Sequence, residues 1–199
     1  AMRKNVKKQL ALRVLSTAAL MAMVSSIATA AFAEEYDLNK GSVTVETKDN
    51  GNTYVTQANT ETTDHLDTTG VTITSNGDPT SNTITVETAK DQTTNVTLEN
   101  VHIETKSSWN DSGSAPIEIK GNGDTNLELN GNNIVLSGNK NHAGIEKADV
   151  NGTGTLTIKD DVNDDGKLLA GGYEDSAGIG GGSYHDGKSY GNTSNITIT

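Results

Sequence analysis

The residues that come nearest to metal chemistry are Asp161-Val162-Asn163-Asp164-Asp165-Gly166-Lys167-Leu168. Oxygen-bearing side chains at the first, third and fifth positions, with glycine at the sixth, match the first half of a calcium-binding loop. The acid expected at the twelfth position is missing, because that residue is Gly172. Two interpretations stay open. Asp161, Asn163 and Asp165 bind calcium as a structural cofactor, or the segment is a solvated corner rich in Asn and Asp.

Aromatic side chains offer a second kind of chemistry, the stacking of rings on sugars. The four candidates lie in loops rich in glycine or polar residues, and they are Trp109, Tyr173, Tyr184 and Tyr190. Exposed rings on a rigid scaffold contact the apolar faces of sugars, while nearby Asp and Asn side chains bond the hydroxyl groups. The four rings are therefore candidate glycan-binding residues. The alternative is that they pack over the side of the fold.

A phosphate-loop pattern, G-x-x-x-x-G-K-S, occurs over residues 182–189 but stands in the wrong context. A phosphate loop needs a helix directly after it, because the helix N-terminus helps to bind the anion. Here residues 190–193 lead into another strand-like run, and Asp186 adds a negative charge inside the loop. We therefore expect no nucleotide partner.

The charge balance argues against catalysis on acidic polymers. The chain has 15 Lys+Arg, 26 Asp+Glu and no cysteine, and five of the basic residues lie within residues 1–33. Residues 34–199 consequently carry a net charge of −16 and no arginine, so they repel nucleic acid and acidic glycans. The four histidines show no metal-binding spacing, and the clustered aspartates of residues 160–165 lie in one corner instead of facing one sugar. No catalytic residue is predicted.

Residues 1–33 have the pattern of a secretory signal peptide. A basic segment over residues 3–8 precedes an apolar stretch over residues 14–24, and Ala31-Phe32-Ala33 come directly before Glu34. The apolar stretch is too short to span a membrane, and the small-x-small triplet fits signal-peptide cleavage. We expect cleavage after Ala33 and a secreted chain associated with the cell wall, which meets the membrane only through the cleaved peptide.

Beyond residue 34 the recurring pattern is a short apolar-x-apolar run set among Asn, Asp, Gly, Ser and Thr. Such alternation predicts β-strands, with two side chains of each run facing inward. No segment shows the period of a helix. The runs begin at Val43, Val71, Ile84, Val96, Val101, Ile117, Leu127, Ile134, Ala143, Leu156, Leu168, Ala177 and Ile196.

The spacing of these runs indicates the kind of all-β fold. Val96, Leu127, Leu156 and Ile196 follow one another at intervals of roughly 30 to 40 residues, and two further runs lie in each interval. A period near 30 with three strands per repeat predicts a right-handed parallel β-helix. Its thin core needs few apolar residues, and its corners suit Asn, Asp and Gly in left-handed conformations. An antiparallel sandwich is the alternative, but it requires longer strands paired as hairpins.

The last part of the chain resembles a known group of proteins. Ser176-Ala177-Gly178-Ile179-Gly180-Gly181-Gly182, then a Gly/Ser/Tyr-rich loop and a final Ile-Thr-Ile run, resemble secreted right-handed β-helix repeat proteins on the surface of Gram-positive bacteria. The resemblance covers roughly residues 71–199. It implies an adhesin-like or carbohydrate-binding surface protein whose coils continue further, often to a cell-wall attachment module.

We expect three parts: the signal peptide over residues 1–33, an N-terminal cap with the first irregular strands over 34–70, and incomplete β-helix coils over 71–199. Because Thr199 lies in a strand run, we expect truncation there, with an open end that allows end-to-end self-association. The expected function is non-catalytic adhesion or binding of glycans and other cell-surface polymers. The alternatives are a structural stalk or layer-forming protein without a ligand, and the non-catalytic start of a polysaccharide-degrading enzyme.

Overall fold

The computed structural model describes residues 33–106, 113–147, 154–173, 175–182 and 193–199, and the expected signal peptide thus lies outside it except for Ala33. The described residues form sixteen strands and no helix. The strands are β1 (Glu34–Asp37), β2 (Val43–Thr47), β3 (Thr53–Gln57), β4 (His65–Asp67), β5 (Val71–Thr74), β6 (Ile84–Thr88), β7 (Thr93–Glu99), β8 (His102–Glu104), β9 (Ile117–Gly121), β10 (Asp124–Asn130), β11 (Asn132–Leu136), β12 (Ile145–Lys147), β13 (Leu156–Lys159), β14 (Lys167–Gly171), β15 (Ile179–Gly180) and β16 (Ile196–Ile198).

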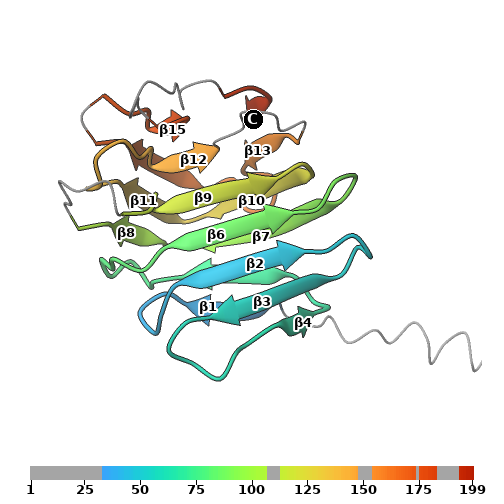
Figure 1. Cartoon of the computed structure of the whole chain (residues 1–199). Helices are drawn as coiled ribbons and strands as arrows, with labels where there is room; N and C mark the ends of the chain where they lie inside the picture. The colour runs from blue at the N-terminus through green and yellow to red at the C-terminus, as the bar shows by residue number, and fades with distance from the viewer. Residues whose placement is uncertain (1–32, 107–112, 148–153, 174, 183–192) are drawn as a thin grey trace, which may run out of the picture. The chain divides into compact units, whose positions relative to one another are not determined.

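These strands form three sheets, and within a sheet the strands of successive coils lie one above the other, as β12, β9, β6 and β2 do in Figure 1. Sheet A has the order β1-β5-β7-β10-β13-β16, and all of its neighbours are parallel. Sheet C has the order β8-β11-β14 and is also parallel. Sheet B is parallel from β15 through β12, β9 and β6 to β2, and then ends in antiparallel β3 and β4.

The chain visits the sheets in a constant order, first A, then C, then B. Strands β7-β8-β9, β10-β11-β12 and β13-β14-β15 are three successive coils. The coil that begins at β5 reaches sheet C only through an isolated bridge between Thr80 and Ile103. Every full coil adds one strand to all three sheets, which confirms the predicted all-β parallel β-helix.

The register differs in one place from the predicted alignment of the runs. Val96 pairs with Leu127, and Leu156 pairs with Ile196, as expected. Leu127, however, pairs with Ile158, while Leu156 pairs with Thr125. Because Thr125 is fully buried and faces the core, β10 begins before its apolar run. The step between these coils, from Thr125 to Leu156, is therefore longer than the interval from Leu127 to Leu156 that the runs suggest.

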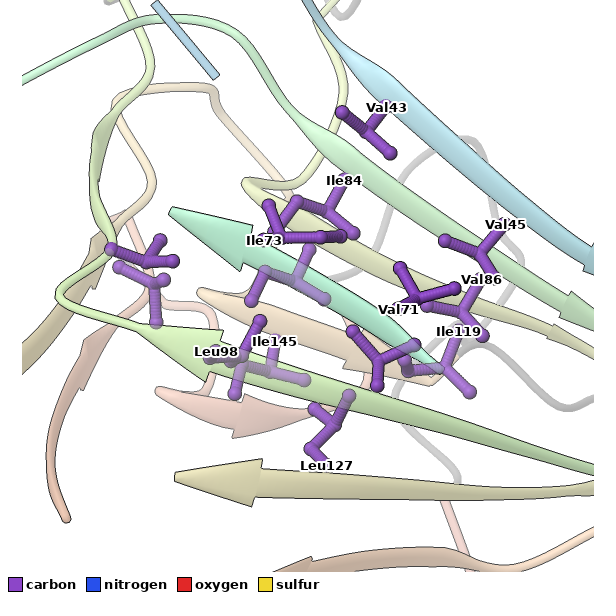
Figure 2. Close-up of a cluster of buried hydrophobic side chains, with 14 of the residues drawn as sticks. Val43, Val45, Val71, Ile73, Ile84, Val86, Leu98, Ile119, Leu127 and Ile145 are labelled. Atoms are coloured by element: carbon purple, nitrogen blue, oxygen red, sulfur yellow. The ribbon is translucent and has the colours of Figure 1, made fainter. Parts of the chain in front are cut away.

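The core consists of columns of aliphatic side chains that stack from coil to coil (Figure 2). In sheet B, one column runs Val43-Ile84-Ile117-Ile145 and the next runs Val45-Val86-Ile119. In sheet A, Val71, Val96, Leu127 and Ile158 stack in register. These side chains are at most 4% exposed. Each one contributes about 1.5–3 kcal/mol of hydrophobic stabilisation.

Hydroxyl groups, not methyl groups, fill the corner where sheet B leads into sheet A. The Thr94 hydroxyl donates to that of Thr47 at 2.6 Å and lies 2.7 Å from that of Thr88. The Thr88 hydroxyl also lies 3.1 Å from that of Thr125. All four side chains are at most 2% exposed, so the corner is a buried polar network whose members satisfy one another.

Asn and Asp residues shape the corners, as the composition predicts. All non-glycine residues with positive φ in the described part of the chain are Asn or Asp: Asn59, Asp64, Asn76, Asp91, Asn100, Asn141, Asp164 and Asn195. Their short polar side chains tolerate the left-handed region better than other side chains do. This composition therefore follows from the number of corners that a β-helix must turn.

Three strands near the start of the fold lie outside the predicted runs. Strand β1 opens sheet A, while β3 and β4 extend sheet B with an antiparallel hairpin. Val55 of β3 is fully buried. The Gln57 amide donates to the carbonyl oxygens of Asp37 and Gly41, at 2.7 and 3.2 Å. The hairpin is thus bonded to the chain that joins β1 to β2.

The last coil is less well buried than those before it. Leu168, Ile179 and Ile196 are only partly buried against the core. Leu169 is 58% exposed and Ile198 is 64% exposed. Strands β12 and β15 begin at Ile145 and Ile179, so the Ala-Gly pairs predicted to start these runs precede the strands.

Candidate functional site

The predicted calcium loop connects β13 of sheet A to β14 of sheet C, and its candidate ligands bond separate protein partners. Asp161 accepts from the Lys159 ammonium at 2.7 Å, and Asp165 accepts from the Gly131 amide at 3.2 Å. The Asn163 side chain donates to Asn130 Oδ1 at 3.3 Å. The geometry therefore does not direct the three side chains toward one centre.

Other residues of the same loop also bond the protein. The Gly166 amide donates to Asp160 Oδ2 at 2.8 Å, and Asp164 has a φ of 54°. Among the described residues, no three His, Cys, Asp or Glu side chains come together as a metal-binding group. Calcium bound by Asp161, Asn163 and Asp165 stays a prediction, and it requires these side chains to leave their present partners.

Of the four candidate aromatic residues, one lies in the described part of the chain. Tyr173 follows β14 and is partly buried, and its backbone amide donates to the His142 carbonyl at 3.4 Å. Trp109, Tyr184 and Tyr190 lie outside the described residues. A shared ring platform therefore stays a prediction.

A feature that the sequence did not indicate is a groove of about 270 Å³ on the outer face of sheet A. Asn95 and Thr97 of β7 and Asn126 of β10 line its middle, between Gly70 before β5 and Val162 after β13. The groove crosses four neighbouring strands, a distance of roughly 14 Å at the usual strand spacing. It is thus longer than a single sugar ring.

The middle of the groove is neutral and rich in hydrogen-bonding groups. The Asn126 side-chain amide donates to Asn95 Oδ1 at 2.9 Å. This bond leaves the Asn95 NH₂ group and Asn126 Oδ1 available as donor and acceptor. The two asparagines lie one coil apart in the sequence and occupy paired outward positions. That spacing is a signal that sequence analysis could have used.

One end of the groove is lined by Glu128 and Lys159, which form an ionic cluster with the neighbouring Asp161. Glu128 is 9% exposed, and its Oε1 accepts from the Asp161 and Val162 backbone amides at 2.7 and 3.0 Å. The Lys159 ammonium lies 2.7 Å from Asp161 Oδ2 and 3.3 Å from Glu128 Oε2. The hydrogen bond to Asp161 raises the Lys159 pKa above its ordinary value of 10.5, with a smaller contribution from Glu128. Lys159 is therefore charged at neutral pH, and the cluster has a net charge of −1.

Val162 provides the apolar part of this end. Its side chain is 72% exposed and lines the groove beside Lys159. Because Glu128 accepts the Val162 amide, a buried carboxylate holds this exposed side chain over the outer face of sheet A. The site therefore combines neutral hydrogen-bonding groups, a fixed ionic cluster and a single apolar wall.

The described histidines are distributed over the fold, and each pairs with one carboxylate. His65 lies 3.0 Å from Glu34, and His102 lies 2.8 Å from Glu104. His142 lies 3.1 Å from the buried Glu146. His185 lies outside the described residues.

Two other depressions, of about 440 and 450 Å³, lie away from this groove. The first is lined by acidic and basic residues near the ends of β2 and β6, including Glu46, Lys48 and Glu87. The second lies near the start of the fold and includes Glu34 and His65, which already form an ion pair. Neither has a neutral row of side chains like that of the groove.

None of the described residues forms a helix that could cross a membrane. Comparison of the chain with protein-family models, curated proteins and solved structures finds no match.

Proposed function

We propose that this chain is a secreted, non-catalytic β-helix that binds carbohydrate at the groove on sheet A, in adhesion at the cell surface. The observation that carries the proposal is the row of neutral hydrogen-bonding side chains, Asn95, Asn126 and Thr97, beside the exposed Val162. Amide and hydroxyl side chains bond sugar hydroxyl groups in both directions, and an aliphatic side chain packs on the C–H face of a ring.

The rigidity of the scaffold supports this proposal. Asn95 and Asn126 lie on adjacent, fully paired strands whose inward neighbours, Val96 and Leu127, are buried in the core. A ligand therefore meets side chains that are already positioned, which lowers the entropic cost of binding. The length of the groove suits an oligosaccharide better than a monosaccharide.

The position of the first strand supports secretion. Strand β1 begins at Glu34, directly after the predicted cleavage position at Ala33. Cleavage there would release the described fold as the mature protein. Expression in a secreting host should yield a chain whose N-terminal residue is Glu34. If the measured mass of the secreted chain includes residues 1–33, this part of the proposal is contradicted.

Binding to an array of neutral oligosaccharides, followed by titration calorimetry on the best ligand, tests the proposed function. Asn95→Ala and Asn126→Ala should each weaken binding about 3- to 10-fold, because each removes about one hydrogen bond to the ligand. Asn132→Ala is the matched control, because Asn132 is an exposed asparagine of β11 in sheet C. Its affinity should equal that of the unmodified chain.

Two results would contradict carbohydrate binding at this groove. If no oligosaccharide binds, the alternative of a stalk or layer-forming protein without its own ligand is favoured. If an oligosaccharide binds equally well to both groove variants, the ligand lies elsewhere on the molecule.

A further inference from the structure

We propose that the groove on sheet A selects neutral glycans over acidic ones, and that Glu128 and Asp161 are the residues that impose this selectivity. The inference rests on the proposed function and names the class of ligand. It follows from the arrangement of charge around Lys159, the one basic side chain among the residues that line the groove.

Lys159 would by itself attract the carboxylate of an acidic sugar. Its ammonium is instead occupied by two carboxylates of the protein, at 2.7 Å from Asp161 and 3.3 Å from Glu128. The remaining lining side chains, which include Asn95, Thr97 and Asn126, are uncharged. A sugar carboxylate would therefore enter a groove whose ionic cluster has a net charge of −1, with no free side-chain cation among the lining residues to pair with.

Glu128 cannot move away to release Lys159. It is 9% exposed, and its Oε1 is held by the amides of Asp161 and Val162. Its second oxygen, Oε2, is buried and accepts no hydrogen bond, so its negative charge remains directed at the lysine. The Asp161 side chain is 62% exposed and pairs with Lys159 at 2.7 Å. One buried and one exposed carboxylate thus both pair with the Lys159 ammonium.

A neutral sugar is not affected in the same way. Its hydroxyl groups can donate to Asp161 and accept from Asn95, and they bring no charge to be repelled. Repulsion of a charged competitor is a common basis of specificity, and here it acts at one end of a site that is otherwise neutral.

The test uses two matched probes and a double variant. The probes are the neutral oligosaccharide that binds best in the array and the same oligosaccharide after oxidation of its primary hydroxyl groups to carboxylates. The double variant Glu128→Gln with Asp161→Asn removes both charges. The amide oxygen at position 128 can still accept from the Asp161 and Val162 backbone amides, and the one at position 161 can still accept from Lys159. We expect at least a tenfold gain in affinity for the oxidised probe, diminished by added salt, and a change below about threefold for the neutral probe.

The control is the double variant Asp164→Asn with Asp165→Asn, which removes the same net charge from the loop after β13 but leaves both ion pairs of Lys159 intact. Its affinity for the oxidised probe should rise much less than that of the Glu128 and Asp161 double variant. The single variant Asp161→Asn, at an exposed side chain, gives a second measurement if the buried Glu128→Gln change prevents folding.

The outcomes separate this inference from the proposed function. Failure of the unmodified chain to bind the neutral probe would overturn both. Binding of the neutral and oxidised probes with equal affinity would overturn only the selectivity. The selectivity alone would also be overturned if the control variant gained as much affinity for the oxidised probe as the Glu128 and Asp161 variants, because the effect would then come from the overall charge.

Discussion

At the scale of single residues, buried hydroxyl groups take the place of aliphatic side chains at one corner of the core. Thr94 is an inner member of this network, because its hydroxyl contacts those of both Thr47 and Thr88. The position is inward and fully buried, so water cannot replace a lost partner. A polar group left unsatisfied there costs its full desolvation energy.

Thr94→Val should therefore lower the free energy of unfolding by about 1–3 kcal/mol, although valine has nearly the same shape. Thr85→Val is the matched control, because Thr85 is an outward-facing, half-buried residue of β6. Its effect should stay within about 0.5 kcal/mol. Urea denaturation of both variants measures the difference, and equal effects would show that the network does not stabilise the fold.

A second residue, Asp124, connects two coils through hydrogen bonds to its carboxylate. Asp124 Oδ1 accepts from the Thr155 backbone amide at 2.9 Å and from the Thr155 hydroxyl at 2.8 Å. These bonds favour the ionised carboxylate, and the Asp124 pKa falls below its ordinary value of 3.8. Because the pKa is lower in the folded protein, Asp124 stabilises the fold above pH 3.8, and this contribution is lost as the pH falls through the lowered pKa.

Asp124→Asn should accordingly lower the Tm at neutral pH, and the difference from the unmodified chain should vanish well below pH 3.8. Asp78→Asn serves as the control, because Asp78 is an exposed residue after β5. A Tm difference for Asp124→Asn that is the same at both pH values would contradict the assigned role. Calorimetry at the two pH values makes the comparison.

The sequence predicts the corner residues well and the inward polar residues poorly. Left-handed Asn and Asp follow from backbone sterics, which act locally. Thr157 stands between Leu156 and Ile158 and is half-buried on the outer face, whereas Thr125 is in phase with Leu127 and is buried. The apolar run at Leu127 does not mark Thr125 as part of the core, and its register with Leu156 does.

At the scale of elements, strands with two inward aliphatic residues could be predicted and strands with fewer could not. Strand β1 reads Glu-Glu-Tyr-Asp, and β3 has Val55 as its one aliphatic residue. Both are held in place by pairing, β1 with β5 of the following coil and β3 with β2 directly before it. Tertiary pairing of this kind overrides weak local preference. The acidic side chains of β1 also protect an edge of sheet A from pairing with other chains.

The hairpin of β3 and β4 should contribute to stability through Val55. Val55→Ala removes two buried methyl groups and should lower the free energy of unfolding by about 2–3 kcal/mol. Leu66→Ala in β4 provides the comparison, because Leu66 is 44% exposed. Its cost should be below about 1 kcal/mol. A larger loss for Leu66→Ala in urea denaturation would show that the hairpin packs differently.

The groove shows why a site on the face of a sheet is harder to predict from the sequence than the strands themselves. Asn95 and Asn126 meet only because β7 and β10 pair in a register that equals one coil length. The candidate residues chosen from local motifs and aromatic side chains, such as Asp161 and Tyr173, lie in corner loops, where the sequence carries no repeated spacing. Asp161 does lie beside the groove, but as the partner of Lys159 and not as part of a group of converging metal ligands.

At the scale of the whole molecule, stability should differ between coils. Strands β7 and β10 of sheet A and β6 and β9 of sheet B have buried aliphatic residues, whereas those of β14, β15 and β16 are only partly buried or exposed. Amide hydrogens of β14 to β16 should therefore exchange with solvent before those of the middle coils. Hydrogen exchange followed by mass spectrometry measures this order. Equal protection in all coils would indicate a single cooperative unit.

Net charge is the second property of the whole molecule that allows a test. Residues 34–199 carry a net charge of −16, so screening by any divalent cation should raise the Tm. We expect Ca²⁺ and Mg²⁺ at equal ionic strength to have the same effect, because Asp161, Asn163 and Asp165 already bond protein partners. An increase specific to Ca²⁺, reversed by a chelator and absent in Asp165→Asn, would instead establish the predicted calcium loop.

The steps from Thr94 to Thr125 and from Thr125 to Leu156 are equal in length, which has a consequence for how such a molecule can change its size. A gene segment that encodes one such step could be copied or removed, and the coils on either side would still present matching backbone groups and matching columns to each other. The cross-section would stay the same while the reach of the molecule grew or shrank by about 4.8 Å for each segment. The length of the β-helix can therefore change while the pairing and the core of each coil stay the same.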